Sequence, residues 1–149
     1  MPRIPPPLIA LLAALLIWLL ARYVPLAQFQ SHYARYLAYG GYFIGICLDF
    51  WGFVWFRRAR TTINPMQIER TSSLVTSGPY AFSRNPMYLG LLIILAGVVI
   101  ANGALSGVIV PFLFAAIVTQ YQIKPEEAVM REKFGTEFDN YAHRVRRWL

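Results

Sequence analysis

The hydrophobic positions of this chain gather into four long apolar stretches separated by more polar segments. The stretches cover residues 8–27, 37–56, 87–101 and 104–121. The last two belong to one uncharged run, Met87–Ile123, which is too long for a single crossing of a hydrocarbon core about 30 Å thick. Asn102-Gly103 lies near its middle and is typical of a turn. The pattern predicts an all-α integral membrane protein with about four transmembrane helices in a single domain, residues 1–149.

The basic residues are divided unevenly between the two ends of these four predicted helices. The N-terminal segment, the loop 57–86 and the C-terminal segment 124–149 share one side and hold twelve of the 14 Lys and Arg residues. Only Arg22 and Arg35 fall on the other side. Since Lys and Arg concentrate in cytoplasmic loops, both termini are predicted to face the cytoplasm.

The composition narrows the class of protein further. The chain is 57% hydrophobic and 14% charged, with a formal net charge of +7, whereas a soluble domain carries about 25% charged residues. Positive charge in so apolar a chain favours basic flanks against membrane lipids and not a nucleic-acid interface. Cys47 is the only cysteine, and His32 and His143 have no cysteine or acid at ligand spacing. We therefore expect neither an internal disulfide nor a metal site.

The C-terminal segment 124–149 has a helical pattern, with Pro125 suited to the first helical position and Gly135 as an interruption. Four apolar residues recur there at intervals of three or four: Phe138, Tyr141, Val145 and Trp148. The segment is predicted to be an amphipathic helix. It lies on the membrane surface, docks on the cytoplasmic loop of the protein itself, or does both, and the pattern leaves these alternatives open.

The end of the loop 57–86 contains two turn signals, Gly78-Pro79 and Asn85-Pro86. Asn85 can cap the following helix, with Pro86 as its first residue. In a purely structural interpretation this stretch is a capped helix entry with aromatic anchors. In a functional interpretation, Arg84 and the positive end of the helix face a ligand, and Tyr80 and Tyr88 offer aromatic faces.

Glu126 and Glu127 directly follow the last apolar stretch. Their structural interpretation is that acids in a first turn complement the helix dipole and that Glu127 pairs with Arg131 at i+4. The functional interpretation depends on the preceding helices. If residues 87–101 and 104–121 form a hairpin, the two acids and Asn85 meet at its cytoplasmic mouth.

Two features lie inside the second apolar stretch. Asp49 is an ionisable residue within the bilayer region, and such residues are functional candidates by default. A hydrogen bond from Arg57 or Asn102 is the structural alternative. Gly41 and Gly45 form a Gly-x-x-x-Gly pair, which predicts close helix packing.

Taken together, these motifs resemble one known family. The segments are Leu74-Val75-Thr76-Ser77-Gly78-Pro79-Tyr80, Arg84-Asn85-Pro86-Met87-Tyr88-Leu89-Gly90, Glu126-Glu127 and Phe134-Gly135-x-Glu137-Phe138-x-x-Tyr141. This combination resembles the isoprenylcysteine carboxyl methyltransferase family and, more distantly, the phospholipid N-methyltransferases. The resemblance covers residues 64–149 and implies a membrane methyltransferase that uses S-adenosylmethionine. It points to the short prokaryotic branch and hence to a prokaryotic plasma membrane.

The resemblance also implies a cofactor site formed by the cytoplasmic loop and the C-terminal helix. Its residues would be Ser72, Ser73, Leu74, Val75, Tyr80, Asn85, Pro86, Met87, Tyr88 and Glu126. Two positions depart from the eukaryotic members, which have histidine in place of Asn85 and a substrate-handling arginine in place of Gln122. The second change leaves the substrate open, with Gln122 as the candidate substrate residue.

The implied reaction is methyl transfer to a lipophilic substrate dissolved in the membrane. O-methylation of a carboxylate is favoured, and N-methylation of an amine is possible. A carboxylate needs no general base, whereas an amine or hydroxyl does, so the candidate catalytic residues are Arg84, Glu127 and Asp49. Two other classes stay open: an NADPH-dependent membrane reductase of the sterol reductase type, and a non-enzymatic adaptor that binds lipid.

Overall fold

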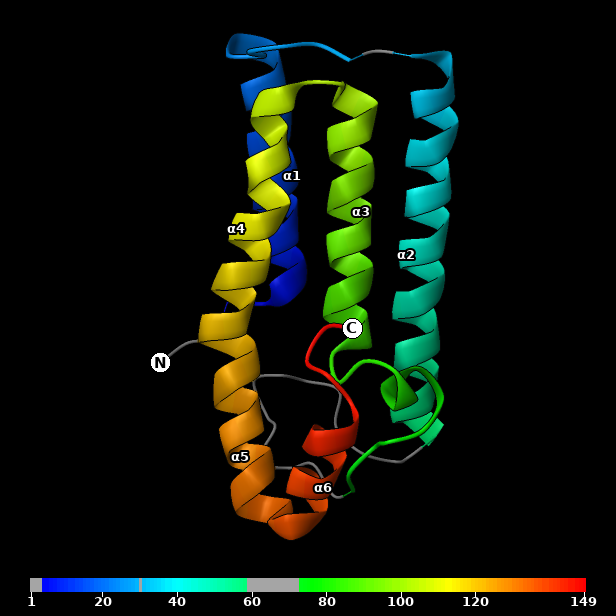
Figure 1. Cartoon of the computed structure of the whole chain (residues 1–149), viewed down its shortest axis with the longest axis vertical. Helices are drawn as coiled ribbons and strands as arrows, with labels where there is room; N and C mark the ends of the chain where they lie inside the picture. Colours follow the sequence, from blue (N-terminus) through cyan, green and yellow to red (C-terminus); the bar gives the residue numbers. More distant parts are fainter. Residues whose placement is uncertain (1–3, 30, 59–72) are drawn as a thin grey trace.

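The computed structural model describes residues 4–29, 31–58 and 73–149. The elements in this part are α1 (Pro6–Tyr23), α2 (His32–Arg58), η2 (Gly78–Ala81), α3 (Pro86–Asn102), η3 (Leu105–Val108), α4 (Ile109–Val118), η4 (Thr119–Ile123), α5 (Lys124–Phe134) and α6 (Thr136–Arg144). The helices α1 to α4 run up and down alongside one another, and α5 extends α4 beyond the bundle (Figure 1). The described part is therefore all-helical, as predicted.

Three of the described helical segments are long and apolar enough to cross a membrane: Pro6–Tyr23, His32–Arg58 and Leu105–Phe134. The apolar helix α3 has 17 residues, which corresponds to about 26 Å at 1.5 Å per residue. Large apolar side chains on the outside of the bundle are exposed, among them Leu11, Phe43 and Phe112. An apolar exterior of this kind fits a lipid environment, and the count of four spans stays a prediction.

The observed helix ends correct several predicted boundaries. α1 ends at Tyr23 and not at residue 27, because Val24 precedes Pro25 and a residue before proline avoids the helical region. α2 is longer than the predicted 37–56 and runs from His32 to Arg58. α3 matches the predicted 87–101 within one residue at each end.

The predicted break between residues 121 and 124 is wrong, because the chain stays helical from Leu105 to Phe134. A π-helical turn, η4, joins α4 to α5. Pro125 is the second residue of α5 and follows this turn after Lys124. Proline has no amide hydrogen and its ring clashes with the carbonyl four residues earlier, so a wider turn relieves the contact without ending the helix.

Glycines bring α2 and α3 into close contact. A Cβ atom on Gly45 would lie 2.7 Å from the carbonyl oxygen of Gly90, and one on Gly97 would lie 2.8 Å from the ring of Tyr42. A Cβ on Gly41 would lie 3.6 Å from the Cα of Gly97. The predicted packing role of the Gly41 and Gly45 pair is confirmed, since both glycines face α3, and a side chain at Gly45 would push the two helices apart, whereas a Cβ on Gly41 would make an ordinary van der Waals contact.

At the end of the bundle away from α5 and α6, the segment between α1 and α2 is hydrogen-bonded to the turn after α3. The amide of Phe29 donates to the carbonyl of Gly103 at 2.8 Å, and that of Leu105 donates to Ala27 at 2.9 Å. Gly103 has a φ of +61° and ends α3, a conformation that glycine adopts without strain. The predicted turn at Asn102-Gly103 is confirmed.

The C-terminal segment docks on the protein itself. Phe138, Tyr141 and Val145 are buried in a cluster with Tyr80, so the docked alternative is correct. Gly135 separates α5 from α6 with a φ of +52°. Helix α6 ends at Arg144, and residues 145–149 return across the start of α3 (Figure 1). The predicted helix 124–149 is thus two helices followed by a non-helical tail.

Candidate active site

An ionic cluster joins the start of α3, the start of α5 and the C-terminal tail. Arg84 Nη2 donates to Glu127 Oε1 at 2.6 Å. Arg147 binds the same carboxylate with two hydrogen bonds, from Nε to Oε1 at 2.9 Å and from Nη2 to Oε2 at 2.6 Å. These hydrogen bonds raise the pKa of Arg147 above its usual value. The side chains of Arg84 and Glu127 are only 12% and 14% exposed, so the pair is largely shielded from water.

The expected pairing of Glu127 with Arg131 is therefore wrong. Arg131 instead contacts Asp139 of α6 at 2.7 Å, in an exposed pair. Arg84, which binds Glu127, also donates through Nη1 to the carbonyls of Ala142 and Val145. Glu127 therefore points toward the C-terminal segment and away from Arg131. Arg84 thus ties three segments together, and this site is more enclosed than an i,i+4 surface pair.

Asn85 begins α3 but does not cap it with its side chain. Its amide Nδ2 donates to the carbonyl of Arg147 at 2.9 Å, because the tail crosses the helix end. Pro86 is the first helical residue, as predicted, and is fully buried. The expected side-chain cap is replaced by a contact with the C-terminal tail.

One turn into α3, Tyr88 faces the start of α5. Its hydroxyl donates to Glu126 Oε1 at 2.8 Å. The two residues are 38 positions apart in the sequence and meet because α3 and the helix from Leu105 to Phe134 form a hairpin. This juxtaposition was expected from the sequence.

Tyr80 occupies the centre of the buried cluster beside this site. Leu74 and Val75 pack against the cluster, and the hydroxyl of Tyr141 donates to the carbonyl of Tyr80 at 2.7 Å. Burial raises the pKa of the Tyr80 phenol far above its usual range, and the charges of Tyr141, Glu126 and Asp49 raise it further. The Tyr80 hydroxyl therefore stays protonated and lies within electrostatic reach of two carboxylates.

Asp49 faces α3 from α2, next to Gly90. A Cβ on Gly90 would collide with Asp49 Oδ1, so only glycine leaves room for this carboxylate. Within the described residues, the buried atom Oδ1 has no hydrogen-bond partner. No hydrogen bond from Arg57 or Asn102 therefore reaches Asp49 Oδ1, and Asn102 instead donates to the carbonyl of Val98.

Met87 completes this side of the site one turn away from Gly90. A Cβ on Gly52 would lie 2.8 Å from Met87 Cγ and 3.5 Å from the hydroxyl of Tyr80. The three residues therefore meet where α2, α3 and η2 converge, one turn along α2 from Asp49.

The remaining predicted residues are less central. Gln122 is 2% exposed, and its Nε2 donates to the carbonyl of Ile4 at 2.8 Å, while its buried Oε1 has no partner in the described part of the chain. The N-terminal segment thus covers the candidate substrate residue. Ser73 is partly buried at the start of the described segment, and Ser72 lies outside the described residues.

Sequence reasoning missed three participants. Arg147 binds Glu127, Trp148 Nε1 donates to Thr119 Oγ1 at 3.1 Å, and Ser83 is fully buried with its Oγ accepting from the amide of Asn85. The sequence predicted a helix through this segment. Because α6 ends at Arg144, the tail that contains Arg147 turns back, and no pattern in the sequence marks that reversal.

The fold and the site define a helical membrane protein with a compact polar site at one end of an apolar bundle. Residues 33–137, more than half of the chain, match the phospholipid methyltransferase family model. The chain therefore belongs to the phospholipid methyltransferase family and is a membrane methyltransferase by family. The predicted kinship is thus confirmed at this broad level, and the reductase and adaptor alternatives are disfavoured.

A search of curated proteins found a short relative in Haemophilus influenzae. The two sequences are 38% identical over 63 residues, which is 42% of this chain and 100% of that protein. The relative is described as an uncharacterized protein. No solved structure matches this chain significantly.

Proposed function

We propose that this protein transfers the methyl group of S-adenosylmethionine to a lipophilic acceptor within the membrane. The observation that carries the proposal is the contact between Tyr88 of α3 and Glu126 of α5. It joins two motifs far apart in the sequence at one end of the bundle, in a chain that belongs to a methyltransferase family.

The residues around this contact suit a positively charged cofactor. Glu126 is partly buried and bound to Tyr88, and Asp49 Oδ1 is a buried acceptor with no partner among the described residues. Acceptors and aromatic faces such as Tyr80 and Tyr88 stabilise a cationic group in a poorly hydrated site. Asn85 and Met87 would complete the wall of the site. The cofactor supplies an electrophilic methyl group, and the protein aligns the acceptor with it and excludes water.

The geometry supports an amine as the acceptor, in preference to the carboxylate that the resemblance alone favours. Carboxylates at Glu126 and Asp49 repel an anionic substrate and attract a cationic one. An ammonium group must lose a proton before its nitrogen can attack. Of the two candidate bases, Glu127 is held by Arg84 and Arg147, so we assign proton acceptance to Asp49.

Arg84 and Glu127 are assigned a positioning role. Arg84 binds two carbonyls of the C-terminal segment, and Glu127 binds Arg84 and Arg147. The two Nη atoms of Arg84 and both oxygens of Glu127 bind other parts of the chain, whereas Arg84 Nε is buried with no partner among the described residues. The pair would hold α3, α5 and the tail at fixed distances around the reacting groups.

Ligand stabilisation of the purified protein tests the proposed cofactor. S-adenosylhomocysteine at about 100 times its dissociation constant should stabilise the folded protein by about 2.7 kcal/mol. NADPH at the same concentration should leave the melting temperature unchanged. Stabilisation by NADPH alone would contradict the proposal and favour the reductase class.

The acceptor is tested separately by methyl transfer in vesicles. Labelled methyl groups should enter lipids with a primary amine headgroup, and Asp49→Asn should lower this rate while S-adenosylhomocysteine binds with nearly unchanged affinity. Labelling of a lipid carboxylate that is insensitive to Asp49→Asn would overturn the amine assignment and leave the cofactor assignment standing.

A further inference from the structure

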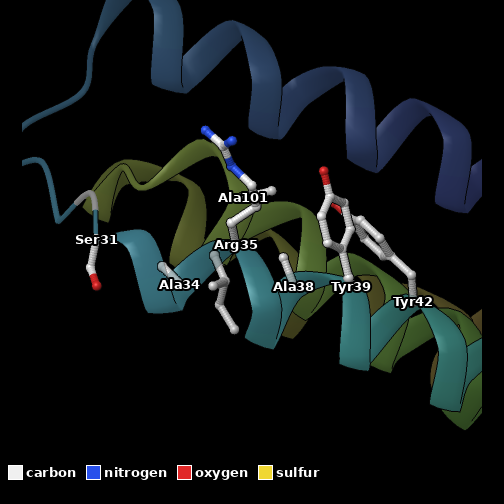
Figure 2. Close-up of a pocket in the computed structure, with 8 residues that line it drawn as sticks. Ser31, Ala34, Arg35, Ala38, Tyr39, Tyr42 and Ala101 are labelled. Carbon is white, nitrogen blue, oxygen red and sulfur yellow. The ribbon is translucent and has the colours of Figure 1, made fainter.

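A second polar site lies at the opposite end of the bundle from the candidate active site. It is a cleft of about 290 Å³ formed by the first three turns of α2 and the last turn of α3. The lining residues are Ser31, Ala34, Arg35, Ala38, Tyr39, Tyr42, Ile100 and Ala101. Arg35 and Tyr39 extend from α2 in the same direction (Figure 2). Three of the lining residues are alanines, and the polar side chains are those of Ser31, Arg35 and the two tyrosines.

Arg35 has no acidic neighbour in the described structure. The described acidic residues are Asp49, fourteen positions further along α2, and those of α5 and α6 at the other end of the bundle. The ion pairs formed within the described residues involve Arg84, Arg131 and Arg147. The cleft therefore presents a guanidinium whose charge the protein itself does not balance.

Exposed tyrosines surround the end of the bundle that contains this cleft. Tyr23, Tyr33, Tyr36 and Tyr39 are exposed around the same end of the bundle. Tyrosine concentrates at the level of lipid headgroups, where its ring is in the apolar layer and its hydroxyl is hydrated. Arg35 lies within the first turn of α2, between Tyr33 and Tyr36 in the sequence.

We propose that this cleft binds the phosphate group of a phospholipid in the leaflet opposite the candidate active site. The Arg35 guanidinium pairs with a phosphate oxygen, a geometry for which arginine is well suited. The hydroxyls of Tyr39 and Tyr42 offer further donors, and the acyl chains lie along the exposed apolar side of α2. This binding does not depend on the proposed methyl transfer.

A competing structural role exists for Arg35. The cleft includes the last turn of α3, and a cation near a helix C-terminus offsets the partial negative charge of its carbonyls. In that case Arg35 would stabilise the protein whether or not a lipid is present. The two roles differ in their dependence on lipid, and this difference decides the experiment.

The test compares Arg35→Gln with Arg22→Gln, which removes the other basic residue at the same end of the bundle. The full-length protein in neutral detergent is titrated with phosphatidylglycerol, phosphatidylcholine or inorganic phosphate, and bound lipid is counted by native mass spectrometry. Phosphatidylglycerol should remain bound to the wild type and to Arg22→Gln. Arg35→Gln should bind it about tenfold more weakly, and Arg35→Lys should recover part of the loss.

Three results would overturn the proposal. Equal losses in the Arg22 and Arg35 variants would indicate general attraction to anionic lipid. Competition by inorganic phosphate at concentrations near that of the lipid would indicate a site for a free anion. An Arg35→Gln variant that melts at a lower temperature but binds lipid like the wild type would assign Arg35 to the end of α3 alone.

Discussion

At the scale of single residues, one carboxylate in the candidate site joins three segments of the chain. Glu127 is bound by Arg84 from the segment before α3 and by Arg147 from the C-terminal tail. The sequence suggested Arg131 because it lies one helical turn away. The i,i+4 spacing rule identifies only partners on the same helix, so it could not predict a contact with the C-terminal tail.

The first prediction concerns this ion pair. Arg84→Ala leaves Glu127 partly buried with one cation fewer and removes the anchor of the tail, so we expect a loss of about 3 kcal/mol, at the low end for a buried pair. Arg131→Ala breaks an exposed pair with Asp139 and should cost about 0.2–1 kcal/mol. Thermal melts in detergent provide the comparison. Similar melting temperatures for both variants would show that the inner pair does not hold the tail.

At the scale of elements, two contacts define how the helices are arranged. The glycine contact fixes the distance between α2 and α3, and the π-helical turn carries the last transmembrane segment into α5 without a break. The first was readable from the spacing of Gly41 and Gly45. The second was not, because Pro125 is equally compatible with the start of a new helix and with a widened turn inside a continuing one.

The second prediction tests the glycine contact. A Cβ on Gly45 would lie 2.6 Å from Ile94 Cγ1 and 2.7 Å from the backbone oxygen of Gly90, so Gly45→Ala must separate the helices and should cost about 1–3 kcal/mol. Gly40 lies on the same helix with nothing within 4 Å of its Cβ position. Gly40→Ala should therefore be neutral or slightly stabilising. Equal melting temperatures of the two variants would contradict the packing described here.

At the scale of the whole molecule, the hydropathy pattern predicted an all-helical membrane protein and the approximate position of every long helix. The polar segments were harder to predict, since their structure depends on contacts between distant positions. Phe138, Tyr141 and Val145 could be identified as one apolar face, but only the folded chain shows that Tyr80 and its neighbours cover it. Two predictions that rested on residue types, Asn85 as a side-chain cap and Glu127 as a partner of Arg131, were wrong for the same reason, because both residues bind Arg147 of the C-terminal tail.

The third prediction concerns the topology of the molecule. Ser31 directly precedes α2 and Thr136 begins α6, and both residues are exposed. The start of α2 and helix α6 lie at opposite ends of the bundle (Figure 1). In a Cys47→Ala background, a membrane-impermeant thiol reagent should label Ser31→Cys from outside the cell. It should label Thr136→Cys only after the membrane is permeabilised. Labelling of both from the same side would mean that the number of spans between them is even and that the bundle does not cross the membrane as the basic residues indicate.

The most direct test of the account is the affinity of S-adenosylhomocysteine for the Glu126→Gln variant, measured by calorimetry. If Glu126 holds a charged or hydroxyl-bearing part of the cofactor, the loss should be about 1.5–3 kcal/mol, or roughly ten- to over a hundredfold in dissociation constant. Glu132→Gln, which changes an exposed acid on the same helix, should bind like the wild type. Wild-type affinity in Glu126→Gln would contradict the central claim that the contact between α3 and α5 marks the cofactor site.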